Sequence, residues 1–323
     1  INAQIVISDG INLNTRHANT LYVAENGNNN NEGNHPQSPY LTVEKALQNA
    51  TAGDTIHILP GVYQERLPLV VPVGVTVKGH SMRAVTIKPD SVDSEDVFYL
   101  NGESTVEDLS IMDFYYNSGT NVGHAFRFAP NMKVTSRSPY IRNVTVITKG
   151  SVTNASDPRG FNQGDAGKGV LVDGASVLNT SQEASMLFHS CTFITPGVDA
   201  LTITNGVRVE WLNSFTYFAN RGLYAVNGST GHLSTDGSTV KFGGEIRSIG
   251  SANVYGNFGA VSDGADCLMY LIQHNFGYIG AGKDVTNDTG LALQAQEVTE
   301  LNSGKIYYSS TDQLGNFRIG DSF

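Results

Sequence analysis

The chain has 323 residues, of which only 15% are charged, and its formal net charge is −10. So low a charged fraction argues against long surface helices, and 20 Lys and Arg residues without a basic stripe argue against nucleic acid as a partner. The apolar runs are too short to span a bilayer, so no membrane insertion is expected. The 35 glycines, with abundant Asn, Ser and Thr, favour short strands and tight turns, and hence an all-β protein.

The first predicted elements are a strand, a loop, a helix and two further strands. The strand Tyr22–Ala24 precedes an Asn-rich polar loop over residues 26–39. Thr42 is a suitable N-cap, and the apolar positions that follow it share one helical face: Val43, Ala46, Leu47 and Ala50. Strands are predicted over 55–59 and 62–65, on either side of a Pro-Gly turn.

The middle of the chain repeats a phrase made of a short strand, a turn and a longer alternating strand. At least four copies are present: Val97–Leu100 with Val106–Met112, Ala125–Phe128 with Ile141–Ile147, Val170–Val172 with Leu187–Ile194, and Ala200–Ile203 with Trp211–Phe218. The equivalent positions Phe193 and Tyr217 lie 24 residues apart (217 − 193), about one coil of a solenoid. Residues 149–168 form the clearest insertion. A jelly roll or sandwich would also give many short strands, but the sustained period favours a β-helix.

The last third of the chain departs from this phrase. After Gly231 many glycines punctuate short segments, which predicts narrower or irregular coils. Two short strands over 306–308 and 317–319 flank a turn and predict a hairpin. We therefore divide the chain into an N-terminal arm and polar loop (1–40), a β-helix with a capping helix at its start (41–290) and a C-terminal hairpin element (291–323).

Two stretches carry resemblances to known proteins. The segment Ala52–Glu65, with its Gly-Asp-Thr strand and Pro-Gly-x-Tyr turn, resembles the opening of pectin-lyase-like proteins. This resemblance implies an all-β, right-handed, single-stranded parallel β-helix with a short N-terminal capping helix. The predicted hairpin adds a small C-terminal β element. Residues Gly231–Gly237 and Gly304–Asp321 resemble segments of structural proteins of cyanophage-like tailed viruses, such as tail fibres. The second resemblance covers roughly the last third and implies a virion protein with other virion proteins as partners.

These features predict a structural and adhesive protein of a tailed phage, exposed on the virion surface or otherwise extracellular. It would form part of a tail fibre, spike or baseplate appendage, bind host-surface polysaccharide and assemble as a homo-oligomer, with a trimer favoured. The alternative is an extracellular polysaccharide hydrolase or lyase on the same scaffold. Gly61–Glu65 fits the Gly-x-Tyr-x-Glu pattern of pectin methylesterases and Arg137–Arg142 fits the Arg-x-Pro-x-x-Arg pattern of pectate lyases. The companion motifs of both enzymes are absent from the sequence, so Glu65 is expected to be structural.

Glycoside hydrolysis needs two carboxylates about 5 to 9.5 Å apart, a separation that neighbouring coils could supply. The candidate catalytic residues at strand ends or turns are Asp173, Asp199 and Glu210, and the candidate glycan contacts near them are His189, Trp211 and Arg221. We favour the simpler interpretation that the aspartates close turns by accepting backbone amides, while Trp211 packs inside or at an edge.

No phosphate-binding loop, metalloprotease motif or nucleophile elbow is present in the sequence. We therefore expect no cofactor. The sequence does not decide whether a calcium ion is bound. The only two cysteines, Cys191 and Cys267, are expected to be buried free thiols, although a disulfide between them is possible.

Overall fold

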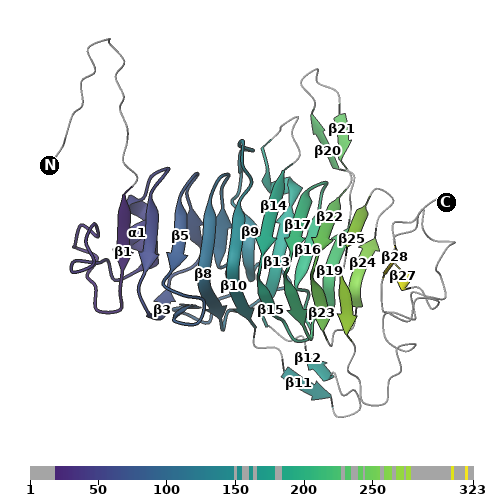
Figure 1. Ribbon diagram of the computed structural model, residues 1–323, viewed down its shortest axis with the longest axis horizontal. Coiled ribbons are helices and arrows are strands. Elements are labelled where there is room, and N and C mark those ends of the chain that lie inside the picture. Colours follow the sequence, from purple (N-terminus) through teal and green to yellow (C-terminus); the bar gives the residue numbers. More distant parts are fainter. Residues whose placement is uncertain are drawn as a thin grey trace, which may run out of the picture.

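The computed structural model is a right-handed parallel β-helix whose coils stack along the long axis of the molecule (Figure 1). The structure describes residues 19–148, 151–154, 160–162, 166–178, 184–226, 230–233, 239–242, 244–254, 258–263, 267–272, 274–277, 307–308 and 317–318. Most strands pair in parallel with the equivalent strand of the next coil. The predicted fold class is thereby confirmed.

Each coil contributes strands to three faces, and the first two faces join into one 15-stranded sheet. The first face consists of β1 (Thr20–Val23), β2 (Thr55–Ile58), β5 (Thr76–Gly79), β8 (Thr105–Met112), β10 (Tyr140–Ile147), β14 (Ser185–His189), β17 (Arg208–Leu212), β22 (Glu245–Ile249) and β25 (Leu268–Ile272). The second face consists of β3 (Gly61–Glu65), β6 (Val85–Pro89), the second halves of β8 and β10, β15 (Thr192–Ile194), β18 (Phe215–Tyr217), β23 (Ala252–Val254) and β26 (Asn275–Gly277). The third face is a separate seven-stranded sheet of β4 (Leu69–Val71), β7 (Phe98–Leu100), β9 (His124–Phe128), β13 (Lys168–Asp173), β16 (Leu201–Thr204), β19 (Arg221–Val226) and β24 (Phe258–Asp263).

The core runs through the middle of the stack because alternate residues of every strand point inward. Aromatic rings from successive coils lie against one another there: Phe98 stacks on Phe126 at 5.6 Å between ring centroids, and Phe188 lies 5.0 Å from Trp211. All four side chains are fully buried. Stacked aromatic pairs add to the free energy of burial and align neighbouring coils.

The corner between the first and second faces is a column of residues in the left-handed backbone region. Asp108 (φ 59°) and Asn143 (φ 51°) lie within β8 and β10, whereas Ser190 (φ 56°) and Asn213 (φ 44°) interrupt the strands of their coils. The predicted single strands Leu187–Ile194 and Trp211–Phe218 are therefore each divided in two, because a left-handed residue turns the chain sharply. Asn143 Nδ2 donates to Asp108 Oδ1 at 3.1 Å, so the side chains of neighbouring corners are hydrogen-bonded to each other.

The helix α1 (Val43–Asn49) covers the N-terminal end of the core with Val43, Ala46 and Leu47. The carboxylate of Glu65 accepts the backbone amides of Val43 (2.7 Å) and Glu44 (3.1 Å) at the start of this helix. Glu65 is only 1% exposed. Its role is therefore structural, as expected, and the capping helix is confirmed.

The irregular parts of the chain differ from the prediction. Two antiparallel hairpins, β11 (Ser151–Asn154) with β12 (Gly160–Asn162) and β20 (Thr230–Leu233) with β21 (Thr239–Phe242), project from opposite sides of the stack in Figure 1. Narrower or irregular coils were expected after Gly231, but the described strands β22, β23, β25 and β26 continue the stack in register. A further antiparallel pair, β27 (Tyr307–Tyr308) with β28 (Phe317–Arg318), forms where a C-terminal hairpin was predicted.

Two expectations on composition can also be compared with the structure. Cys191 and Cys267 are buried free thiols, as expected. Among the described residues no helix is both long and apolar enough to cross a membrane.

Candidate ligand-binding face

The third face carries a column of ionisable side chains, one from each successive coil, just before or at the start of its strands. The column, called here the charged column, consists of Asp96, His124, Lys168, Asp199 and Arg221. Lys168 pairs with His124 across β13 and β9, and the amide of Ala200 donates to the carbonyl of Arg221 at 3.0 Å. Successive members are thus about 4.8 Å apart along the axis.

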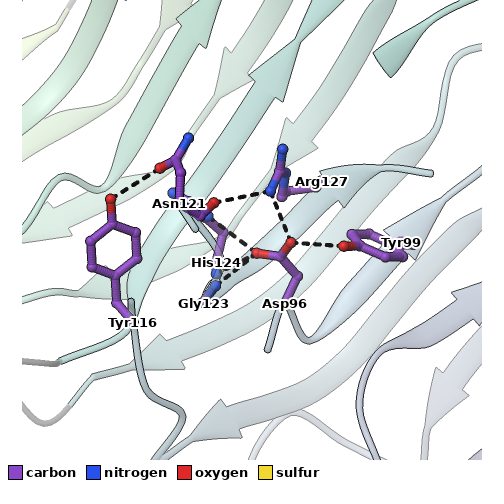
Figure 2. Close-up of polar contacts among 7 residues, drawn as sticks. All are labelled: Asp96, Tyr99, Tyr116, Asn121, Gly123, His124 and Arg127. Atoms are coloured by element: carbon purple, nitrogen blue, oxygen red, sulfur yellow. Dashed lines mark hydrogen bonds and ion pairs between the residues drawn. The ribbon is translucent and has the colours of Figure 1, made fainter. Parts of the chain in front are cut away.

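Asp96 is the most completely bound carboxylate of this column (Figure 2). It is fully buried, and its Oδ1 accepts the amides of Gly123 (2.9 Å) and His124 (2.8 Å). Its Oδ2 accepts the Tyr99 hydroxyl and Arg127 Nη1, both at 3.0 Å. Burial acts to raise the pKa of Asp96, but the His124 hydrogen bond and the Arg127 charge outweigh it and hold the pKa below its usual value. Asp96 is therefore an ionised anchor.

His124 is only 3% exposed, and its Nδ1 lies 3.2 Å from Asp96 Oδ1. Burial lowers the pKa of His124, although the neighbouring Asp96 opposes the shift, so the imidazole is neutral at physiological pH. Because a carboxylate can only accept, Nδ1 carries the proton and Nε2 keeps its lone pair. The ring packs edge to face against Tyr116 at 5.5 Å between centroids.

A second carboxylate and guanidinium pair lies further along the same face. Arg221 donates from Nε to Asp199 Oδ1 (2.8 Å) and from Nη2 to Asp199 Oδ2 (2.6 Å). Its guanidinium also lies over the ring of Tyr224, 3.7 Å from the centroid. Asp199 is 5% exposed, so this two-bond pair is largely shielded from water.

The outward-facing residues of the third face form a second column, called here the outer column: Tyr99, Arg127, Leu171, Thr202 and Tyr224. All but Leu171 are partly exposed. Lys168 adds a further cation, because its Nζ lies 4.1 Å from the centroid of the Tyr116 ring. The face therefore presents tyrosine rings and cations in fixed positions on neighbouring strands.

The structure brings only two of the six predicted site residues together. Asp199 and Arg221 form the pair described above, whereas Asp173 caps the short 3-10 helix Gly174–Ser176 by accepting the amide of Ala175 at 2.8 Å. Asp173 also accepts Nδ2 of Asn205 at 2.6 Å, so it closes a turn.

The other predicted residues belong to the first face. Glu210 lies on β17, outside the sheet that contains β16, so the suggested Asp199 and Glu210 pair does not converge on one face. His189, at the end of β14, pairs in register with Leu212 and lies on this same first face. Trp211 is fully buried between Phe188 and Phe193, so its indole offers no surface to a glycan. The inward position follows from the strand alternation, which places Trp211 and Val209 on the core side.

Sequence reasoning missed Asp96, Tyr99, His124 and Arg127, although a signal was present. Each short strand of the repeated phrase is preceded by an ionisable residue and a small or β-branched one, as in Asp96-Val97-Phe98 and Asp199-Ala200-Leu201. Aligning the copies on their first buried strand residue would have placed the charged column in a single line.

A cavity of about 480 Å³ lies away from the third face, beside β3 at the N-terminal end. Its lining residues are Glu25, Leu41, Thr42, Val62, Tyr63, Gln64 and Glu65. Both carboxylates are engaged by backbone amides, Glu65 as described above and Glu25 by Val62 at 2.8 Å. Among the described residues, no cluster of three His, Cys, Asp or Glu side chains is arranged to hold a metal ion.

Comparisons with known proteins add a family match and several distant structural likenesses. Residues 25–86 match a family described as a protein of unknown function (DUF1565). No curated protein matched the sequence.

Three solved structures illustrate the likeness. A rhamnogalacturonan lyase is 14% identical, with 74% of this chain and 70% of that chain covered at a TM-score of 0.49. Escherichia coli YbhC is 13% identical, with 79% and 71% covered at 0.47. Pectin methylesterase PemA from Erwinia chrysanthemi is 13% identical, with 88% and 96% covered at 0.33. The β-helix assignment rests on the strand pairing itself, and none of the three is close enough in sequence to transfer its activity to this chain.

Proposed function

We propose that this protein binds a polysaccharide on the third face of its β-helix and acts as a rigid adhesive element. The observation that carries the proposal is the outer column, in which Tyr99 and Arg127 occupy successive coils and Tyr224 lies three coils beyond Arg127, above two buried aspartates. A sugar ring presents an apolar face and a rim of hydroxyl groups. Tyrosine rings match the face, and guanidinium groups match the oxygen atoms.

Rigidity favours binding on this surface. Arg127 is held by Asp96 and by the carbonyl of Asn121 (3.1 Å), while Arg221 is held by two bonds to Asp199. Side chains that are already ordered lose little conformational entropy when a ligand arrives. A stack of strands also places the side chains of successive coils in a straight line, which suits a linear polymer.

The arrangement favours binding over hydrolysis. Asp96 and Asp199 are three coils apart, about 14 Å at 4.8 Å per coil, which exceeds the roughly 9.5 Å limit for the carboxylate pair of a glycosidase. Both carboxylates are ion-paired with arginine, and the lowered pKa of Asp96 makes it a poor proton donor. A polysaccharide hydrolase or lyase is therefore the second candidate.

The setting that we propose is the outside of a cell or particle, and specifically the surface of a tailed-phage virion. The late-chain sequence resemblance and the low charged fraction support this setting. Other virion proteins as partners and a homotrimer belong to the same proposal. Detection of the chain in purified phage particles by mass spectrometry is the expected outcome, and its absence from them would count against the virion setting.

Affinity electrophoresis of the full chain tests the binding itself. The protein is run in native gels that contain pectin, rhamnogalacturonan, alginate or dextran, which together cover acidic and neutral chains. We expect at least one polymer to retard the protein, and Arg127→Gln to reduce the retardation. Arg66→Gln, at an exposed arginine that belongs to neither column, should leave it unchanged. Equal mobility of the original protein in all gels would refute binding to these classes. The same mixtures are also assayed for new reducing ends or unsaturated products. Their appearance would show cleavage and would favour the hydrolase or lyase over the adhesive protein.

A further inference from the structure

The third face contains the same set of side chains twice. The first set is Asp96 with Arg127 and Tyr99, and the second is Asp199 with Arg221 and Tyr224. In each set a buried aspartate holds an arginine beside a partly exposed tyrosine. The two sets therefore offer a ligand the same three residue types at two places, with Arg127 in the outer column and Arg221 in the charged column.

The spacing of the two sets follows from the register. Asp96 and Asp199 are members of the same charged column and are three coils apart, which is about 14 Å. Tyr99 and Tyr224 belong to the same outer column, four coils apart, which is about 19 Å. The line that joins the sets is thus parallel to the axis of the β-helix, and Lys168 lies between them.

Both arginines keep hydrogen-bonding capacity for a ligand. Arg127 donates to Asp96 and Asn121 through Nη1, and its side chain is 16% exposed. Arg221 donates through Nε and Nη2, and its side chain is 29% exposed. A guanidinium has five N–H groups. Arg127 Nε is buried and Arg221 also hydrogen-bonds to Tyr224, so the donors left for a ligand are the remaining terminal N–H groups.

We propose that the two sets are equivalent subsites for one linear polysaccharide that lies along the third face. The inference rests on the proposed function and adds a requirement of length. A chain that reaches both subsites is held at two points, whereas a shorter oligosaccharide occupies either one independently. Binding at the second point is then intramolecular, so the longer chain gains roughly 10²-fold or more in affinity without any new kind of contact.

Isothermal titration calorimetry with a size series of oligosaccharides tests this requirement. The oligomers are prepared from whichever polymer of the gel panel retards the protein most. We expect short oligomers to bind twice per chain with weak affinity, and oligomers above a threshold length to bind once and roughly 10²-fold more tightly.

Arginine substitutions on the full chain locate the two points. Arg127→Gln and Arg221→Gln should each halve the stoichiometry for short oligomers and reduce the affinity for long ones to the short-oligomer value. The double variant should abolish the binding of both short and long oligomers. Arg127→Lys and Arg221→Lys keep the ion pairs, and circular dichroism identifies any variant that fails to fold.

The outcomes separate the inference from the proposed function. Tight binding that does not depend on length, or that survives either single substitution, overturns the two-subsite arrangement but leaves polysaccharide binding intact. Failure of every panel polymer to bind overturns both. Retention of a protein or peptide partner at Arg127 and Arg221, with no polysaccharide bound, assigns the face to a different class of ligand and also overturns the inference.

Discussion

Replacing Asp96 with Asn should destabilise the protein by about 3 to 5 kcal/mol, the usual cost of removing one partner from a buried ion pair. The substitution keeps the size of the side chain but removes the charge that balances Arg127, whose side chain is only 16% exposed. It also turns one acceptor into an amide donor, which cannot accept both sets of hydrogen bonds now made to Oδ1 and Oδ2. A loss of this size is a large part of the 5 to 15 kcal/mol that stabilises a typical domain.

Urea unfolding measured by fluorescence suits this test, because the chain contains a single tryptophan and Trp211 is fully buried. Asp93→Asn is the matched control, since Asp93 is exposed and close in sequence, and it should change stability by less than about 0.5 kcal/mol. A loss below about 1 kcal/mol for Asp96→Asn would refute the reasoning, because it would mean that the carboxylate is not an ionised, buried anchor.

The pH dependence of the same site provides a second check. The pKa of Asp96 is lower in the folded protein than its usual value of 3.8, so the folded state binds this proton less tightly than the unfolded chain. The stabilisation is therefore complete above pH 3.8 and is lost as the pH falls through the folded pKa. Asp96→Asn should be less sensitive to acid over that window than the original protein, and equal sensitivity would contradict the assignment.

Further predictions concern other parts of the helix. Burial raises the pKa of Glu65 from 4.5 to about 7, so ionisation of this carboxyl lowers the stability of the fold as the pH rises through that interval. Glu65→Gln should therefore remove about 3 kcal/mol from the difference in unfolding free energy between pH 5 and pH 8, measured in urea. Trp211→Ala should cost about 3 to 5 kcal/mol, measured by circular dichroism in guanidinium, and a loss below 1 kcal/mol would contradict its central packing. Asn213→Ala should cost about 1 kcal/mol because Asn213 has a φ of 44°, whereas Asn213→Gly should be close to neutral in the same assay. Burial raises the pKa of Cys191 to about 12, so Ellman's reagent should react with this thiol only after unfolding, and rapid reaction of the native protein would show that the coil opens.

The strands of the coils could be read from the sequence because their determinants are local. Alternation of apolar and polar residues set the limits of β8 and β10 to within one residue, and Thr42 marked the start of α1. The two divided strands were missed because Ser190 and Asn213 have no apolar signal that marks a corner. The inward position of Trp211 follows from alternation with Val209, and it agrees with the favoured expectation that this side chain packs inside or at an edge.

The amino-acid sequence by itself determined the β-helix and its capping helix, and it contains an ionisable residue before each short strand that sequence reasoning did not recognise as a column. Only the tertiary structure decided which of these residues meet. Asp96 and Arg127 are 31 residues apart, whereas Asp199 and Arg221 are 22 apart. Loops of different length separate successive coils, and Arg127 lies three residues beyond His124, the residue that aligns with Asp96 in the next coil. Contact within each pair depends on the register in which one coil stacks on the next, and that register is set by backbone pairing and core packing along the whole helix.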